Sequence, residues 1–223
     1  MSHKRRPVDK SPLGHRAAGE PGEVASPLRI IGGTHRGRKL FYSGDPRTRP
    51  MKARVRESVF NLLGPSPRGH HAIDLFAGTG ALGLEALSRG ATRATFFERH
   101  FPTAEGIRQN AAALQLQDVC DVIPANTFIQ FRRDDPLVAP GHAASTTDEP
   151  LPWLVFCSPP YDLFVDQLDE MLQLLDQVFS RAPSGSVIVV EADARFDFAR
   201  LPHAGEWDIR EYPPAFVGIY RVE

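Results

Sequence analysis

A motif that starts at Asp74 contains the residue types of a nucleotide-binding turn. Residues 72–76 are apolar except for Asp74, which is typical of a short buried strand. Gly78 and Gly80 permit a tight turn whose backbone can approach a ligand, and the residues that follow have a helical pattern. A strand, glycine loop and helix in this order place backbone N–H groups at the carboxyl end of a strand, where α/β sheets bind nucleotides.

The glycine spacing does not identify the ligand by itself. Gly78, Gly80 and Gly83 form G-x-G-x-x-G, which is compatible with NAD, FAD or S-adenosyl-L-methionine (SAM). Asp74 favours SAM, because a carboxylate beside the loop would repel a pyrophosphate but attract the α-ammonium and sulfonium groups of SAM. An ordinary strand–helix turn without a ligand is the alternative. The predicted cofactor loop is completed by Phe76 and Thr79.

Two polar residues follow the next two predicted strands. Glu98 ends the strand over 94–97, where a carboxylate can accept hydrogen bonds from both ribose hydroxyls of a nucleoside. Asn126 follows the strand over 119–123, where its amide can donate and accept toward an adenine edge. Turn chemistry explains an isolated asparagine equally well, so this assignment depends on Asp74 and Glu98.

Ser158-Pro159-Pro160-Tyr161 follows an apolar strand over 153–157. The prolines fix the backbone and offer carbonyls without competing N–H donors. An exocyclic base amine is a poor nucleophile, because its lone pair is delocalised into the ring. Hydrogen bonds from this amine to the Ser158 hydroxyl and the Pro159 carbonyl would localise the lone pair, and a flipped base could stack on Tyr161. The turn therefore predicts methyl transfer to a base amine; taken alone, it would be an ordinary loop.

These residues can meet only if their strands end at one edge of a sheet. Alternating strand and helix patterns predict a mostly parallel α/β sheet of seven strands, closed by an antiparallel hairpin at residues 207–212 and 216–222. A fifth strand is predicted over 187–191. Helices are predicted over 51–63, from 81 onward, and over 102–114, 127–133 and 166–179, with a surface insertion at 134–150.

The charge distribution is uneven along the chain. Residues 1–56 carry 14 Lys and Arg against 4 Asp and Glu, whereas the whole chain has a net charge of −1. This asymmetry predicts that the N-terminal part of the chain binds a polyanion, whereas the rest of the protein is acidic. A solvated basic tail would explain the charges within 1–27, but less easily the denser block after it.

This basic block has three predicted parts: a β-hairpin of 29–31 and 38–42, a connector over 44–50, and the helix over 51–63. Arg56 lies on the apolar side of that helix, so it either pairs with a buried acid or serves the substrate cleft. The candidate RNA-binding residues are Arg36, Arg38, Lys39, Arg47, Arg49, Lys52, Arg54 and Arg56.

The chain resembles the RsmD-type 16S rRNA guanine-N2 methyltransferases from about Arg29 to Val222. The resemblance is carried by Ile30-Ile31-Gly32-Gly33, Arg36-Gly37-Arg38-Lys39-Leu40, Arg49-Pro50, Arg54-Val55-Arg56-Glu57, Phe60-Asn61 and Asp74 to Ala86. It implies a Rossmann-like class I methyltransferase fold, SAM as cofactor, and 16S rRNA in an assembling 30S particle as substrate. It also supports Glu98 and Asn126 as ribose and adenine contacts. The expected organisation is a disordered tail (1–27), a basic RNA-binding extension (28–64) and a methyltransferase domain (65–223).

One residue departs from the family pattern. Ser158 stands where the family usually has aspartate, and Ser-Pro-Pro-Tyr is the form of cytosine-N4 methyltransferases. The alternatives are therefore a cytosine-N4 or adenine-N6 methyltransferase acting on DNA or RNA, or an rRNA-binding assembly factor without catalysis. A NAD-dependent oxidoreductase is disfavoured by Asp74.

We expect a cytoplasmic monomer without a metal site. Cys120 and Cys157 are isolated on apolar strands and have no metal-ligand spacing. We expect both to be reduced core residues. No apolar run approaches the roughly 18 residues of a membrane span.

Overall fold

The computed structural model describes residues 28–45, 48, 50–65, 67–137 and 150–223. The predicted tail over 1–27, the candidate residues Arg47 and Arg49, and most of the predicted insertion at 134–150 lie outside these ranges.

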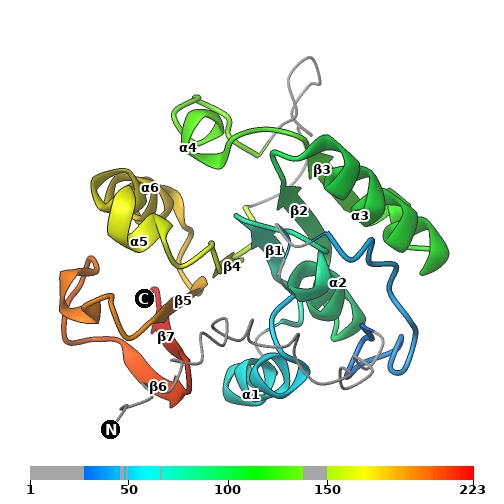
Figure 1. Ribbon diagram of the computed structural model, residues 1–223, viewed down its shortest axis with the longest axis horizontal. Coiled ribbons are helices and arrows are strands. Elements are labelled where there is room, and N and C mark those ends of the chain that lie inside the picture. The colour runs from blue at the N-terminus through cyan, green and yellow to red at the C-terminus, as the bar shows by residue number, and fades with distance from the viewer. Residues whose placement is uncertain (1–27, 46–47, 49, 66, 138–149) are drawn as a thin grey trace, which may run out of the picture.

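A seven-stranded sheet forms the centre of the protein (Figure 1), with the strand order β3-β2-β1-β4-β5-β7-β6. The first five strands are parallel, whereas β7 runs antiparallel to both β5 and β6. This confirms the predicted mostly parallel sheet with an antiparallel C-terminal hairpin. The strands are β1 (His71–Asp74), β2 (Arg93–Phe97), β3 (Cys120–Ile123), β4 (Trp153–Cys157), β5 (Val187–Asp193), β6 (Asp208–Tyr212) and β7 (Ala215–Arg221).

Helices cover both faces of the sheet (Figure 1). One face carries α1 (Ala53–Leu63), α2 (Ala81–Ser88) and α3 (Phe101–Ala113). The other carries α4 (Thr127–Gln130), α5 (Leu163–Asp166) and α6 (Leu168–Arg181). Two 3₁₀ turns, η1 (Gln117–Val119) and η2 (Phe198–Arg200), complete the elements. The sequence predictions missed α5, η1 and η2, and α4 ends three residues before its predicted end.

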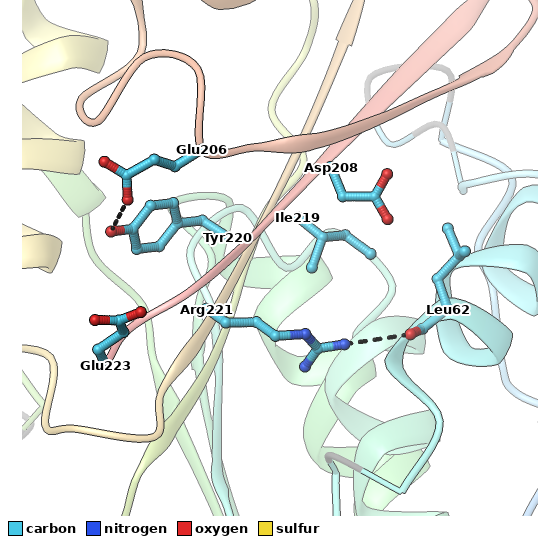
Figure 2. A pocket seen from close by; sticks show the side chains of 7 residues that line it. All are labelled: Leu62, Glu206, Asp208, Ile219, Tyr220, Arg221 and Glu223. Carbon is cyan, nitrogen blue, oxygen red and sulfur yellow. Dashed lines mark hydrogen bonds between the residues drawn. The ribbon is translucent and has the colours of Figure 1, made fainter.

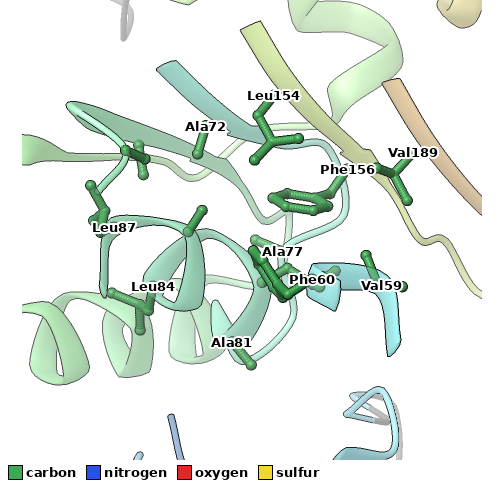
Figure 3. Packing of buried hydrophobic residues seen from close by; sticks show 14 of the residues in the cluster. Val59, Phe60, Ala72, Ala77, Ala81, Leu84, Leu87, Leu154, Phe156 and Val189 are labelled. Carbon is green, nitrogen blue, oxygen red and sulfur yellow. The ribbon is translucent and has the colours of Figure 1, made fainter. Parts of the chain in front are cut away.

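Helix α1 of the basic extension packs directly on the sheet (Figure 3). The Phe60 ring lies 5.7 Å from the ring of Phe156 on β4, and Val59 is fully buried in the same cluster. Burying side chains of this size typically stabilises a fold by about 1.5–3 kcal/mol each. The extension is therefore built into the core beside the strands that carry the predicted site.

Strand β1 is shorter than predicted, because Leu75 and Phe76 belong to the turn that follows it. The chain bends there so that the Ala77 N–H donates to the Phe97 carbonyl at 2.9 Å. This bend directs the glycine loop toward the end of β2, where Glu98 lies.

The predicted N-terminal hairpin forms one bridge, between Arg29 and Lys39. Three backbone hydrogen bonds join its arms, from the N–H of Ile30 to the Arg38 carbonyl, of Gly37 to the Ile30 carbonyl and of Leu40 to the Leu28 carbonyl. The intervening backbone bonds instead to α2, where the Thr34 N–H donates to the Ser88 carbonyl at 2.7 Å and the His35 N–H donates to the Ser88 Oγ at 2.9 Å. The two arms therefore pair over a shorter length than predicted, and the loop between them is held on α2.

Candidate active site

The carboxyl edge of the parallel strands brings together the residues predicted to bind the cofactor and the base. Across the sheet they follow β3, β2, β1 and β4 in that order, as Asn126, Glu98, the Gly78–Gly80 loop and the turn that starts at Ser158. The chain runs from β1 outward to β2 and β3, and then crosses back to β4 on the other side of β1. Such a switch point opens a crevice at the ends of the strands.

The glycine loop is held against Glu98. Gly78 and Gly80 have φ angles of 51° and 74°, which side chains rarely adopt. The Gly78 N–H donates to the Glu98 Oε2 at 2.9 Å, and the His100 N–H donates to its Oε1 at 2.8 Å. Each carboxylate oxygen keeps a further acceptor position, so Glu98 can still accept from ribose hydroxyls.

Gly83, the third glycine of the motif, serves packing rather than a ligand. A Cβ on this residue would lie 2.4 Å from the Phe96 ring of β2. The glycine therefore allows α2 to lie close to the sheet, which fixes the direction of the loop before it.

Asp74 is almost fully buried at 1% exposure, and neither carboxylate oxygen makes a hydrogen bond within the described residues. Burial raises its pKa to about 7; the backbone N–H groups of Gly83 and Phe76, which lie nearby but outside hydrogen-bond geometry, oppose the rise, and the Glu98 carboxylate adds to it. A buried carboxylate without donors is costly. Its environment suits a cationic ligand that supplies the missing charge and donors.

The other predicted cofactor residues surround this loop with mixed roles. The Phe76 ring packs edge-on against Phe128 at 5.9 Å, and Thr79 is 8% exposed. Asn126 caps α4, because its Oδ1 accepts from the Phe128 N–H at 2.9 Å. The cap uses the carbonyl of this side chain and leaves its NH₂ group for a ligand.

The polar side chains of the Ser158–Tyr161 turn converge on Glu191, which the sequence analysis did not single out. The Ser158 hydroxyl donates to Glu191 Oε2, and the Tyr161 hydroxyl donates to Oε1 at 2.7 Å. The Pro160 carbonyl accepts from the N–H of Leu163 at 2.9 Å at the start of α5. Within the described ranges no donor reaches the Pro159 carbonyl, which matches its predicted availability to a base amine.

A pattern in the sequence could have identified Glu191. It is the first charged residue after the apolar run Val187–Val190. Glu98 likewise is the first charged residue after the apolar strand over 94–97. Glu98 follows β2, and Glu191 follows the part of β5 that pairs with β4.

Five of the predicted RNA-binding residues are exposed. The Arg38 Nη2 donates to the Ala113 carbonyl at the end of α3 at 2.7 Å, so this arginine lies across the neighbouring helix. The exposed basic residues, here called the basic surface, are Arg36, Arg38, Lys39, Lys52 and Arg54.

Arg56 does not belong to the basic surface, contrary to its place among the candidates. It is 1% exposed, and its Nη2 donates to the Arg29 carbonyl at 2.6 Å. Its Nε lies 3.9 Å from Glu85 Oε2, so the buried-acid alternative describes it. Burial lowers its pKa, and the Glu85 charge opposes that effect.

Glu85 of α2, fully buried, joins the extension to the sheet domain. Its oxygens accept from the N–H groups of Ile31 and Gly32, both at 2.7 Å, and from Arg89 Nε at 2.9 Å. A Cβ on Gly32 would overlap the Arg89 guanidinium, so a side chain there would displace this arginine from Glu85. The Glu85 cluster, comprising Glu85, Arg56 and Arg89 with these two N–H groups, thus fixes the position of the basic surface.

The connector over 44–50 contacts the glycine loop through Thr48. The Tyr42 hydroxyl donates to the Thr48 carbonyl at 2.7 Å, and a Cβ on Gly78 would lie 3.1 Å from the Thr48 methyl group. The extension therefore reaches the predicted cofactor loop as well as α2.

A separate hollow of about 310 Å³ lies at the C-terminal hairpin (Figure 2). It contains none of the predicted site residues, so it is not part of the candidate active site. Its lining consists of Leu62, Glu206, Asp208, Ile219, Tyr220, Arg221 and Glu223.

The cysteines agree with the expected core role. Cys157 is fully buried and Cys120 partly so; both are free, and burial raises the pKa of both thiols. Within the described ranges there is no cluster of three or more metal-ligating side chains. In the same part of the chain, no helix has the length and apolar character of a membrane span.

Comparisons with known proteins agree with this architecture. The family model described as "Conserved hypothetical protein 95" matches residues 28–212. "Putative rRNA methyltransferase YlbH" of Bacillus subtilis is 33% identical over 74% of this chain and 83% of its own length. "Ribosomal RNA small subunit methyltransferase D" of Escherichia coli is 48% identical over 40% of this chain, but the match covers only 44% of that protein.

Solved structures confirm the predicted fold class. "Putative methyltransferase yhhF" from Escherichia coli superimposes with a TM-score of 0.68 and 27% identity, over 89% of this chain and 99% of that one. An RNA methyltransferase from Salinibacter ruber, solved in complex with S-adenosyl-L-homocysteine, shares the fold at 15% identity and a TM-score of 0.54, over 78% and 94% of the two chains.

Proposed function

Because the chain belongs to the RsmD-type family described as "Conserved hypothetical protein 95", we propose that it is a SAM-dependent methyltransferase of small-subunit rRNA. Its target is an exocyclic base amine, the N2 amine of a guanine in 16S rRNA. The observation that carries this proposal is the placement of Ser158 and Tyr161 on the sheet edge beside Asp74 and Glu98, with β4 adjacent to β1.

The glycine loop fits SAM in charge and shape. Asp74 supplies two unpartnered carboxylate oxygens for the α-ammonium group. Glu98 accepts from the ribose hydroxyls while it holds Gly78, and the positive φ angles keep backbone close to the ligand. When bound, the cofactor supplies a methyl group made electrophilic by its sulfonium. Relatives named as methyltransferases and a neighbour solved with S-adenosyl-L-homocysteine support this assignment.

The Ser158–Tyr161 turn prepares the amine. The amine donates to the Ser158 oxygen and the Pro159 carbonyl, so its lone pair is directed out of the base ring, and Tyr161 provides a stacking surface. On accepting the methyl group that the bound cofactor would supply, the amine nitrogen would release one proton. Glu191 is the carboxylate bonded to Ser158 and is the base in reach of this hydroxyl.

The basic surface binds the rRNA backbone. Its side chains carry positive charge into solvent, whereas the Glu85 cluster holds the same segment on α2. Phosphate contacts of this kind supply affinity and register but little base selectivity. Selectivity is therefore left to the turn on β4 and its neighbours. The substrate we propose is an assembling 30S particle, in which the target base can still leave its stack.

The proposal is tested by incubating the protein and SAM with small-subunit particles from a strain that lacks the gene, followed by mass spectrometry of the nucleosides. We expect one equivalent of N2-methylguanosine. Formation of N4-methylcytidine or N6-methyladenosine would mean that the protein methylates a different base. Tight rRNA binding without methyl transfer would indicate an assembly factor.

A further inference from the structure

Glu191 lies next to Ser158 across two neighbouring strands. Cys157 on β4 pairs with Val190 on β5, so Ser158 and Glu191 occupy the next position of the same parallel register. Parallel neighbours point to the same face of a sheet, and Glu191 is only 6% exposed. Its carboxylate therefore lies inside the site that receives the target base, beside the hydroxyl proposed to hold the amine.

Only hydroxyl groups bind this carboxylate within the described residues. Ser158 donates to one oxygen and Tyr161 to the other. Arg195, the arginine that follows Glu191 most closely in the chain, pairs with Asp162 and Asp193 instead. A buried carboxylate that lacks a cation lowers stability. Its presence at the carboxyl edge indicates that it acts on a ligand.

The hydrogen bonds from the two hydroxyls to Glu191 leave further acceptor positions on Glu191 and Ser158 that a base can use. An ionised carboxylate has about four acceptor positions, of which the hydroxyls use two. Ser158 directs its proton toward Glu191, so the lone pairs of its oxygen remain for an incoming N–H. Ser158 and Glu191 together present only acceptors, and a carboxylate is supplied beside position 158 although position 158 itself is neutral.

The Watson–Crick edges of the bases differ in how they match such acceptors. Guanine has two adjacent donors, N1–H and the N2 amine. Cytosine and adenine each place a ring-nitrogen acceptor beside the amine, and its lone pair would face the carboxylate. Buried groups left unpaired in this way are strongly disfavoured, and sites built to hydrogen-bond a group can discriminate by about 10⁴-fold.

We propose that Glu191 selects guanine, accepting from N1–H while the N2 amine donates to Ser158 and Pro159. This inference rests on the proposed function, since it names the base read by the same site. It makes Glu191 a specificity-determining residue that touches the substrate, and it explains how serine can replace aspartate in this chain without loss of guanine as the target.

A first experiment uses the wild-type protein saturated with S-adenosyl-L-homocysteine. Guanosine, cytidine and adenosine 5′-monophosphates are titrated separately, and binding is followed by saturation-transfer NMR. We expect guanosine monophosphate to bind at least about tenfold more tightly than the other two, as one discriminating pair of hydrogen bonds provides. Equal binding of the three nucleotides would overturn the proposal without any variant.

A second experiment compares Glu191→Gln with Glu206→Gln in single-turnover methyl transfer to the small-subunit particles. Glutamine keeps the size of the side chain but replaces one acceptor by a donor. We expect N2-methylguanosine formation to fall about 100- to 1,000-fold in Glu191→Gln, with SAM affinity unchanged. Glu206 also accepts from a tyrosine hydroxyl, that of Tyr220 at 3.1 Å, but outside the site, so its variant should keep the wild-type rate.

The outcomes separate the two proposals. If wild type forms N2-methylguanosine and Glu191→Gln forms it equally fast, Glu191 neither reads the base nor accepts its proton, while methylation of guanine N2 at this site stands. If wild type forms a different product or none, the proposed guanine-N2 function is wrong, and with it the role of Glu191 in selecting guanine. If Glu191→Gln loses SAM binding or its cooperative thermal transition, the variant is not properly folded. The nucleotide titration of the wild type then decides whether the site selects guanine.

Discussion

The interface between the extension and α2 differs from the sheet edge in how it treats a buried carboxylate. Glu85 at the interface is fully buried and receives two backbone N–H groups and an arginine. Asp74 at the sheet edge is as deeply buried but receives no hydrogen bond within the described residues. The same burial therefore serves two purposes. Glu85 stabilises the fold, whereas Asp74 awaits a ligand.

Glu191 is intermediate between these two. It has two donors, but both are hydroxyls of the turn that is proposed to hold the substrate. A count of unsatisfied acceptors thus separates structural from functional carboxylates more clearly than burial does. Variants of the two regions should accordingly change different measured quantities.

The largest effect is expected at the interface. Glu85→Ala removes the charged partner of the buried Arg56 and leaves the partly buried N–H groups of Ile31 and Gly32 without this acceptor. Breaking a buried pair in this way should lower the free energy of unfolding by about 3–5 kcal/mol, measured by chemical denaturation. Glu105→Ala breaks an exposed pair with Arg108 and should cost less than about 1 kcal/mol. Equal losses would remove the distinction.

At the sheet edge, Ser158→Ala should change turnover instead. Loss of an acceptor that orients the amine should slow single-turnover methyl transfer by roughly 10- to 1,000-fold, while the affinity for SAM is kept. Ser180→Ala on α6 removes an exposed hydroxyl bonded to the Gln177 carbonyl and should have the wild-type rate. A Ser158→Ala enzyme with the wild-type rate would reduce the turn to a connecting loop.

The basic surface should affect RNA binding without affecting stability. With about 6 phosphate contacts, the log–log salt dependence of rRNA binding should have a slope near −4 to −5. Replacing Arg36, Arg38 and Lys39 by glutamine should reduce its magnitude by about 2 to 3. Arg200 and Arg210, exposed near the C-terminal hairpin, provide control variants with an unchanged slope. An unchanged slope in the triple variant would mean that the rRNA does not bind at the basic surface.

The strands could be predicted because buried parallel strands are short apolar runs with charges at their ends. Glu98 and the turn at Ser158 were found in this way, since the carboxyl ends of parallel strands meet at one edge. The hairpin around Arg29 is shorter than predicted: backbone hydrogen bonds join its two arms, but the backbone of the loop between them donates to α2.

Two other features could not be derived from the sequence. Arg56 pairs with Glu85 across two helices that are separate in the chain, so the helical pattern showed only that it faces the core. The bond from Ser158 to Glu191 depends on the register between β4 and β5. Long-range pairing of this kind is set by packing, and local patterns do not determine it.

The pH dependence of the apo protein gives a further test of Asp74. Burial raises its pKa from 3.8 to about 7, so the folded state binds a proton that the unfolded chain has released. The free energy of unfolding should therefore fall as the pH rises from about 4 to 7 and level off above. Denaturation of Asp74→Asn should lack this contribution. A contribution that rises with pH would indicate a paired carboxylate.

The most direct measurement of the central claim is calorimetric titration of SAM into wild type, Asp74→Asn and Glu85→Gln between pH 6 and 8. A cationic ligand binds the ionised carboxylate, so wild-type affinity should rise through pH 7 and then level off, because the pKa of Asp74 is about 7. Asp74→Asn should remain folded, bind at least about tenfold more weakly at pH 8, and lose this rise. Glu85→Gln should be less stable, but its folded fraction should bind like wild type. Wild-type affinity and pH dependence in Asp74→Asn would contradict the assignment of this carboxylate to the cofactor.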